Sequence, residues 1–346
     1  MRPSKMAARP HKAAPAAPVF PMNLPPAASS TLSEEDLAAF AKRLGGPEVL
    51  RRRLQMQAMI EADPEVEETG RVNLHRLLER MKLLWEALRV LGLTEWGRRN
   101  MLAVRREENI LRLRDLPKPL RGARLLHLSD LHADMDPGIV PAVVRALEGW
   151  EYDAVVLTGD YRAHTRHEWD GAVAACRELT RALRPEAPVF AVLGNHDALE
   201  MVPGLEALGW QVLLNEAAVW RWHGAELWIA GVDDDHTYQT ADVAKARAAA
   251  PPEACALLLS HTPGTYARAA GAGFAGQLSG HTHGGQMCLP GGWSPVNNAH
   301  APRRLMRGTW DQGGMAGYTS RGAGACRLPA RFFCPPEVTR HTLESR

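Results

Sequence analysis

Residues 124–132 read Arg-Leu-Leu-His-Leu-Ser-Asp-Leu-His, a short apolar run that ends on the polar pair Asp130 and His132. The same arrangement, a β-rich run followed at once by polar side chains, recurs downstream at residues 154–157, 189–193, 256–259 and 277–279. Helical patterns near residues 140–147 and 168–183 separate the first of these runs. This alternation predicts an α/β fold with at least partly parallel strands.

Side chains of the kind that bind metals follow every one of these runs. They are Asp130 and His132, then Asp160, then Asn195, His196 and Asp197, then His261, and finally His281 and His283. In open α/β sheets, ligands bind beyond the carboxyl ends of the strands, so we expect these groups to meet at one rim. A single Asp-x-His is common by chance, whereas the recurrence of polar, metal-type residues after five apolar runs is not explained by core packing.

The residue types indicate a site for divalent metal ions. Neutral imidazole and carboxylate suit Mn²⁺, Fe²⁺ or Zn²⁺, and no thiolate occupies any of these positions, which argues against a cysteine-based structural zinc site. Two ions roughly 3.5–4 Å apart need a bridging carboxylate and can then clamp both the attacking and the leaving oxygen of a phosphoryl transfer. They would also lower the pKa of bound water from 15.7 toward about 7.

The order Asp-x-His, Gly-Asp, Gly-Asn-His-Asp, Ser-His and Gly-His-x-His resembles the calcineurin-like metallophosphoesterases. The stretch 280–286 and the tail 331–337 resemble the bacterial YkuE/YaeI-like branch, and the resemblance covers roughly residues 108–340. It implies a four-layer α/β/β/α sandwich with two mixed sheets. It also implies dinuclear metal-dependent hydrolysis of a phosphoester by a metal-activated hydroxide, with a diester favoured over a monoester.

The resemblance further implies a role for each site residue. The first ion would be held by Asp130, His132 and His283, with Asp160 bridging to a second ion completed by Asn195, His261 and His281. His196 would stabilise the transition state or protonate the leaving alkoxide, and Asp197 would orient His196. The implied cofactors are two divalent ions, with Mn²⁺ preferred and Fe²⁺ or Zn²⁺ as alternatives.

We expect three segments along the chain. Residues 1–30 are rich in Pro and Ala and predict a disordered tail. Residues 31–107 predict a helical extension, which begins at the capping pair Ser33 and Asp36. Residues 108–346 would form the metallophosphoesterase domain.

Charge and hydropathy restrict the expected cellular location and the expected binding partners. The formal net charge of +2 does not favour nucleic-acid binding, and no nucleic acid is expected as a partner. No run of 18 apolar residues and no secretory signal is present, so a cytoplasmic location is expected. The five cysteines are dispersed and predict reduced thiols rather than disulfides.

The helix expected over residues 74–91 has Leu and Trp on one stripe and Arg and Lys elsewhere. It fits either a helix packed on the main domain or a partner helix, or an in-plane helix peripheral to an anionic membrane. The resemblance to the YkuE/YaeI-like branch implies a lipid-linked substrate such as UDP-diacylglucosamine as one candidate, and the second alternative would suit a substrate held in a bilayer. Two other functions are considered: a soluble nucleotide or small-molecule phosphodiesterase, and an interaction scaffold that works through the N-terminal helices. The oligomeric state stays open.

Two further segments are interpreted from their composition. Asp233-Asp234-Asp235-His236 predicts a solvated loop rather than another metal cluster. Met287–Leu289 predicts a strand, and residues 219–230 predict a hairpin around His223-Gly224.

Overall fold

The computed structural model of the chain describes residues 32–62, 74–165, 169–295 and 298–346, without the side chains of residues 74–81. The predicted tail over residues 1–30 lies outside these ranges.

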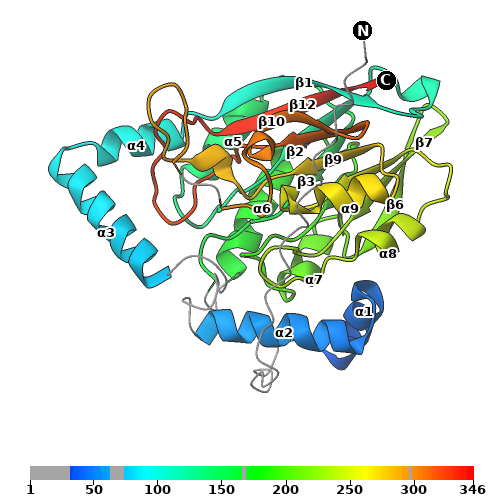
Figure 1. Cartoon of the computed structure of the whole chain (residues 1–346), viewed down its shortest axis with the longest axis horizontal. Coiled ribbons are helices and arrows are strands. Elements are labelled where there is room, and N and C mark those ends of the chain that lie inside the picture. The colour runs from blue at the N-terminus through cyan, green and yellow to red at the C-terminus, as the bar shows by residue number, and fades with distance from the viewer. Residues whose placement is uncertain (1–31, 63–73, 166–168, 296–297) are drawn as a thin grey trace, which may run out of the picture.

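Within the described residues, strands form two six-stranded mixed sheets (Figure 1). The first sheet has the order β1-β12-β2-β3-β4-β5, and the second has the order β10-β11-β9-β8-β7-β6. The strands are β1 (Arg105–Leu113), β2 (Arg124–Leu128), β3 (Ala154–Leu157), β4 (Val189–Ala191), β5 (Trp210–Val212), β6 (Glu216–Trp222), β7 (Ala225–Gly231), β8 (Ala256–Leu259), β9 (Gly276–Ser279), β10 (Gly308–Gln312), β11 (Met315–Thr319) and β12 (Glu337–Ser345).

Helices precede, connect and cover these strands. The α-helices are α1 (Glu34–Leu44), α2 (Pro47–Ala62), α3 (Leu74–Val90), α4 (Thr94–Met101), α5 (Ile139–Leu147), α6 (Asp170–Ala182), α7 (Met201–Glu206), α8 (Val243–Ala248) and α9 (Tyr266–Gly271). Short 3₁₀ turns are η2 (Lys118–Leu120), η3 (Pro263–Thr265), η4 (His283–Gly285) and η5 (Arg303–Leu305).

Three apolar clusters define four layers. One lies between the two sheets and joins Val156 and Phe190 of the first to Ile229 and Leu257 of the second. A second packs α5, α6 and α7 on the outer face of the first sheet. A third packs α8 and α9 on the outer face of the second sheet. The predicted α/β/β/α sandwich is therefore confirmed.

The strands that precede the predicted ligands run parallel. β2, β3, β4 and β5 pair in parallel in the first sheet, and β7, β8 and β9 do so in the second. Their carboxyl ends therefore point toward the same rim. The predicted strands at 124–128, 154–157 and 256–259 are confirmed without a shift. The hairpin around His223-Gly224 is also confirmed, but its strands β6 and β7 are longer than predicted.

Other parts of the sheets differ from the sequence prediction. Met287–Leu289 is not a strand and makes only single bridges, from Met287 to Phe332 and from Leu289 to Trp293. Gln286 has φ of 47°, and this left-handed turn prevents an extended ladder from starting there. The sequence reasoning also missed the long parallel pair of β1 and β12 at the edge of the first sheet.

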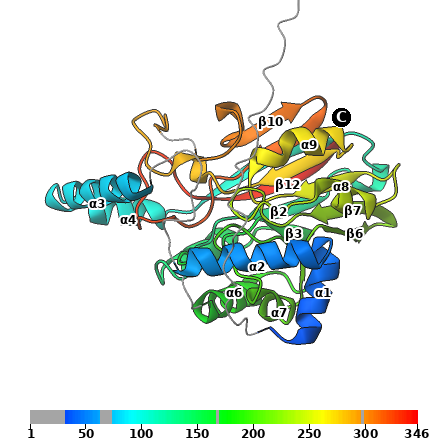
Figure 2. The same cartoon turned by 60° about the horizontal axis from the view of Figure 1, so that its bottom comes forward.

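The N-terminal helices divide into two pairs. Ser33 and Asp36 form the predicted capping box of α1, and Phe40, Leu44 and Leu50 of α1 and α2 join the outer cluster of the first sheet. Figure 2 shows α2 alongside α6 and α7, whereas α3 and α4 extend away from the sheets. No helix in the described part of the chain is long and apolar enough to cross a bilayer.

The two sheets approach closely at Gly231, the last residue of β7. A Cβ built there would overlap Leu213 and lie 2.6 Å from Cγ1 of Val192, which directly follow strands β5 and β4 of the opposite sheet. We predict that Gly231→Ala destabilises the protein by about 1–3 kcal/mol, because the overlap forces the sheets apart. Chemical denaturation measures this change. Gly271→Ala, at an exposed end of α9 with open space around it, is the control and should cause no loss; equal stability of both variants would contradict the prediction.

Candidate metal centre

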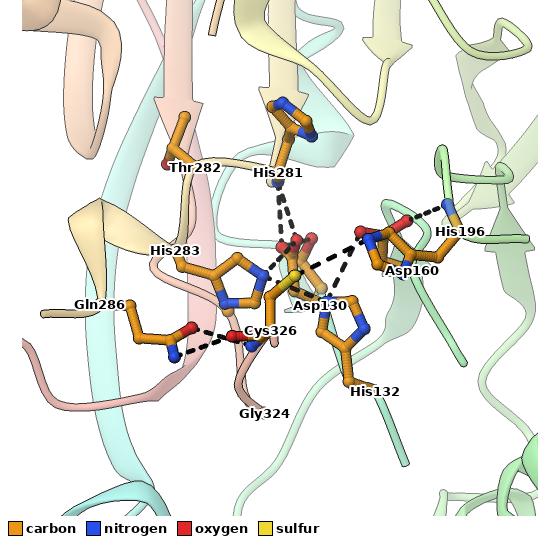
Figure 3. Close-up of polar contacts among 12 residues, drawn as sticks. Asp130, His132, Asp160, His196, His281, Thr282, His283, Gln286, Gly324 and Cys326 are labelled. Carbon is orange, nitrogen blue, oxygen red and sulfur yellow. Dashed lines mark hydrogen bonds and ion pairs between the residues drawn. The ribbon is translucent and has the colours of Figure 1, made fainter. Parts of the chain in front are cut away.

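The predicted ligands and His196 lie in loops that follow β2, β3, β4, β8 and β9, and they form one connected cluster. Figure 3 shows the part of it that contains Asp130, Asp160 and His283. None of these side chains is more than 6 % exposed. The sheets thus bring together residues that are far apart along the chain, at the rim where the parallel strands end.

The backbone at the cluster is strained. Five of the predicted ligands have φ between 41° and 69°, a left-handed conformation that is uncommon for residues other than glycine. They are Asp130, His132, Asp160, His281 and His283. Such conformations cost of order 1–3 kcal/mol each and tend to occur at functional sites.

The first group of donors comes from the loops after β2 and β9. The Nε2 atoms of His132 and His283 lie 3.1 Å apart, and His283 Nε2 lies 3.4 Å from Asp130 Oδ1. The backbone N–H of His281 and the hydroxyl of Ser129 donate to the Asp130 carboxylate, which fixes its orientation. One ligand atom from each of Asp130, His132, His283 and Asp160 can be chosen so that all four lie within 4.8 Å of one another. This spacing suits one cation.

The second group combines two imidazoles and an amide. Asn195 Oδ1 lies 3.1 Å from His261 Nε2 and 2.9 Å from His281 Nδ1, and these two nitrogens are 3.2 Å apart. The main-chain carbonyl of Thr158 accepts from His261 Nδ1, so the ring presents Nε2 to the group. These separations match those between ligands of one ion bound at about 2.0–2.2 Å.

Asp160 connects the two groups. Its Oδ1 accepts the backbone N–H of His196 at 2.9 Å. Its Oδ2 lies 3.5 Å from His132 Nε2 and 3.3 Å from His261 Nε2. One carboxylate oxygen therefore faces both groups, which is the geometry that a bridging ligand requires.

The protonation states of the first group fit a cation. Burial lowers the pKa of His132 to about 3, and burial together with His132 and Arg331 lowers the pKa of His283 well below its usual range. Both rings are therefore neutral, which is the form that binds metals. Burial raises the pKa of Asp130 to about 6, and the neighbouring Asp160 adds to this rise, whereas His261 acts against it.

The carboxylate of Asp160 also attracts positive charge. Burial acts to raise its pKa, but His261 and His196 lower it well below the usual range. Burial lowers the pKa of His261, yet Asp160 raises it to about 10 overall. His261 of the second group therefore holds a proton beside the Asp160 carboxylate, and a divalent cation there would supply the same positive charge. We conclude that the two groups of donors fit a pair of metal ions.

His196 and Asp197 have separate contacts. The Nδ1 atom of His196 lies 2.8 Å from the main-chain oxygen of Ala163, which orients the ring. The Asp197 carboxylate instead accepts the backbone N–H groups of Gly194, Asp160 and Tyr161. Asp197 was expected to orient His196, but its carboxylate joins two loops of the site and supports the position of Asp160, because backbone amides surround it.

Sequence reasoning missed most of the groups that hold the ligands. Arg331 is fully buried, and its Nη2 atom lies 3.1 Å from His283 Nδ1. The main-chain oxygen of Arg162 lies 2.8 Å from His132 Nδ1. Carbonyl groups leave no signal in the residue type, so sequence cannot reveal them. Arg331 lies in the quoted tail, but its type alone does not reveal its contact.

The acidic segment 233–236 is not the solvated loop that its composition predicts. Asp233 and Asp234 are each 1 % exposed. Asp234 accepts three backbone N–H groups from the turn that follows it, and Asp233 pairs with Arg53 of α2. The prediction was wrong because the buried guanidinium that pairs with Asp233 belongs to Arg53, which lies 180 residues earlier in the chain.

Comparison with known proteins agrees with this geometry. Residues 123–285 match the family described as calcineurin-like phosphoesterase. The matched residues include all seven predicted ligands, and the match supports a phosphoric ester hydrolase of a kind that uses divalent metals.

Bacterial relatives cover most of the domain. The chain is 26 % identical over 248 residues to the uncharacterized metallophosphoesterase YkuE of Bacillus subtilis, covering 66 % of this chain and 82 % of that protein. It is 28 % identical over 232 residues to the phosphodiesterase YaeI of Escherichia coli, covering 62 % and 80 %. The resemblance to the YkuE/YaeI-like branch is confirmed.

Solved structures also match. One is a novel archaeal phosphodiesterase, with TM-score 0.31, 11 % identity, and coverage of 57 % of this chain and 84 % of that one. Another is the Escherichia coli phosphoesterase Yfce, with TM-score 0.30, 13 % identity, and coverage of 59 % and 82 %.

We predict that Mn²⁺ raises the thermal unfolding midpoint of the chelator-treated protein and that Asp160→Asn removes most of this rise. At free Mn²⁺ 100-fold above Kd, binding to the native state alone stabilises it by about 2.7 kcal/mol. Differential scanning fluorimetry with and without Mn²⁺ measures the effect. Glu253→Gln changes an exposed carboxylate and serves as the control. A full Mn²⁺ response in Asp160→Asn would show that Asp160 does not bridge.

Proposed function

We propose that the protein hydrolyses a phosphodiester at a dinuclear centre. The ligands of the first ion are Asp130, His132 and His283, those of the second are Asn195, His261 and His281, and Asp160 bridges the two. The observation that carries the proposal is Asp160 Oδ2, which faces both donor groups within 3.5 Å. The relative YaeI is named a phosphodiesterase, which favours a diester.

The chain's own residues supply the rest of the chemistry. Divalent cations, with Mn²⁺ preferred, would supply Lewis acidity and lower the pKa of a bound water. His196 lies with its ring centroid 4.8 Å from that of His132, at the edge of the first group. Its Nδ1 contacts the Ala163 carbonyl and its Nε2 lies 3.7 Å from Cys326 Sγ, so the ring is held from both sides. Nε2 is the nitrogen that would donate a proton to the departing alkoxide.

We predict that His196→Gln lowers kcat for bis-p-nitrophenyl phosphate by about 10²–10⁴-fold, the usual contribution of a general acid. The variant should still bind the same amount of Mn²⁺, since His196 is not among the proposed ligands. Steady-state kinetics with Mn²⁺ and metal analysis test both parts. A wild-type protein that binds two ions but hydrolyses no phosphoester would overturn the proposed function and favour a scaffold role.

The substrate that we propose is lipid-linked, in the class of UDP-diacylglucosamine. The resemblance to the YkuE/YaeI-like branch implies this class, and an apolar surface formed by α3, α4 and the turn between them supports it; we call this the arm surface. Its members are 38–82 % exposed and are Leu83, Leu84, Val90, Leu91 and Trp96. Lys82, Arg89 and Arg99 are exposed on the same helices and would suit anionic lipid headgroups.

The arm surface adjoins the site through a small apolar cluster. Trp85 and Leu88 of α3 pack with Phe332 and with Met287, which lies four residues after the proposed ligand His283. The helix predicted over 74–91 therefore packs on the domain through one part of its apolar stripe and leaves the other part exposed. This arrangement favours a membrane that is contacted beside the metal centre.

We predict that the full chain floats with vesicles of phosphatidylcholine and phosphatidylglycerol, and that Val90→Gln combined with Leu91→Gln reduces flotation several-fold. Both side chains are more than two-thirds exposed, so the fold should be unaffected. Ile110→Gln, which removes an exposed apolar side chain of β1, is the control. If the double variant and the control float equally, the soluble nucleotide or small-molecule phosphodiesterase is the better assignment.

A further inference from the structure

Arg53 of α2 is among the largest fully buried side chains of the described residues, although it belongs to the N-terminal extension. Arg53 lies outside residues 123–285, the segment that matches the calcineurin-like phosphoesterase family. A buried guanidinium is costly unless each of its donors is satisfied. Its partners therefore indicate what it does.

One of those partners belongs to the loop of the metal centre that carries Asn195. Arg53 Nη2 donates to the main-chain oxygen of Asp197 at 2.8 Å, and Nε pairs with Asp233 Oδ2 at 3.2 Å. Nη1 donates to Gln57 Oε1 one turn along α2. The planar guanidinium also lies over the ring of Tyr238, with Cζ 3.4 Å from the ring centroid.

Tyr238 and Gln57 extend this contact to both sides of the loop. The Tyr238 hydroxyl donates to the main-chain oxygen of Asn195 at 3.1 Å. Gln57 Oε1 accepts the backbone N–H of Leu199 at 3.1 Å, and Gln57 Nε2 donates to Glu200. The loop 195–200 is thus held along its length by groups organised around Arg53.

This loop carries Asn195, the weakest donor of the second group. An amide oxygen is neutral, so its contribution depends on accurate placement more than that of a carboxylate does. His261 and His281 follow directly from strands β8 and β9, whereas Asn195 lies four residues beyond the end of β4. Its position therefore depends on what supports the loop from outside.

We propose that Arg53 is a positioning residue for the second cation, which it serves by fixing the loop that carries Asn195. The proposal rests on the dinuclear site of the proposed function. In this proposal α2 supports the metal centre, whereas α3 contributes the exposed apolar arm surface. Loss of a group that supports a metal ligand typically costs 10–100-fold in metal affinity.

The test is a calorimetric titration of Mn²⁺ into the chelator-treated full chain. The wild type should bind two ions, and Arg53→Met should bind the first with unchanged affinity and the second about 10–100-fold more weakly. Electron paramagnetic resonance at two equivalents of Mn²⁺ should show a coupled pair in the wild type and largely isolated ions in the variant. Excess Mn²⁺ should restore the coupled signal, which a collapsed fold would not allow.

Two further variants complete the experiment. Arg51→Met, on the same helix with a side chain 59 % exposed, is the matched control and should leave both binding steps unchanged. Tyr238→Phe removes only the hydroxyl that binds the Asn195 carbonyl and keeps the ring that packs on Met56 and Ile60. It should weaken the second step several-fold, and it decides the question if Arg53→Met does not fold.

The outcomes separate this inference from the proposed function. A wild type that binds fewer than two ions overturns the dinuclear site and the positioning role together. A wild type with two ions, combined with unchanged second-ion binding in Arg53→Met and Tyr238→Phe, overturns the positioning role alone. Equal weakening of both ions in these variants also overturns it, because the effect would then be general.

Discussion

The buried carboxylate of Asp160 is the group on which the arrangement of the site depends. One of its oxygens is held by the backbone N–H of His196, so the other is left to face His132 and His261. Gly194 lies so close that any Cβ there would overlap this carboxylate. A carboxylate confined in this way attracts positive charge, and the donors around it suit two divalent cations.

Holding that carboxylate in place requires the whole sandwich. The ligands adopt left-handed backbone conformations that cost energy, and the apolar cluster between the sheets stabilises the strands from which they project. Asp197 contributes by accepting amides from the loops after β3 and β4, so that the two loops move as one unit. The core of the fold thus offsets the strain at its rim.

The N-terminal extension has two parts with different physical relations to the domain. Helix α2 inserts the buried Arg53 beside the metal loops, where its charge is matched by Asp233. Helix α3 instead packs through Trp85 and Leu88 and leaves Leu83 and Val90 exposed. We infer that α2 supports the metal centre. We propose that α3 faces the membrane that would hold a lipid-linked substrate.

The sequence by itself determined the strand and helix pattern of the central domain and the residue types of its candidate ligands, because apolar runs and the polar residues that follow them are local features. The edge pair β1 and β12, the failed strand at 287–289 and the burial of Asp233 were decided only by tertiary structure. Each depends on a partner distant in the chain, such as Arg53 for Asp233. The orientation of the histidines also depends on distant partners, because it is controlled by main-chain carbonyls that any residue type could supply.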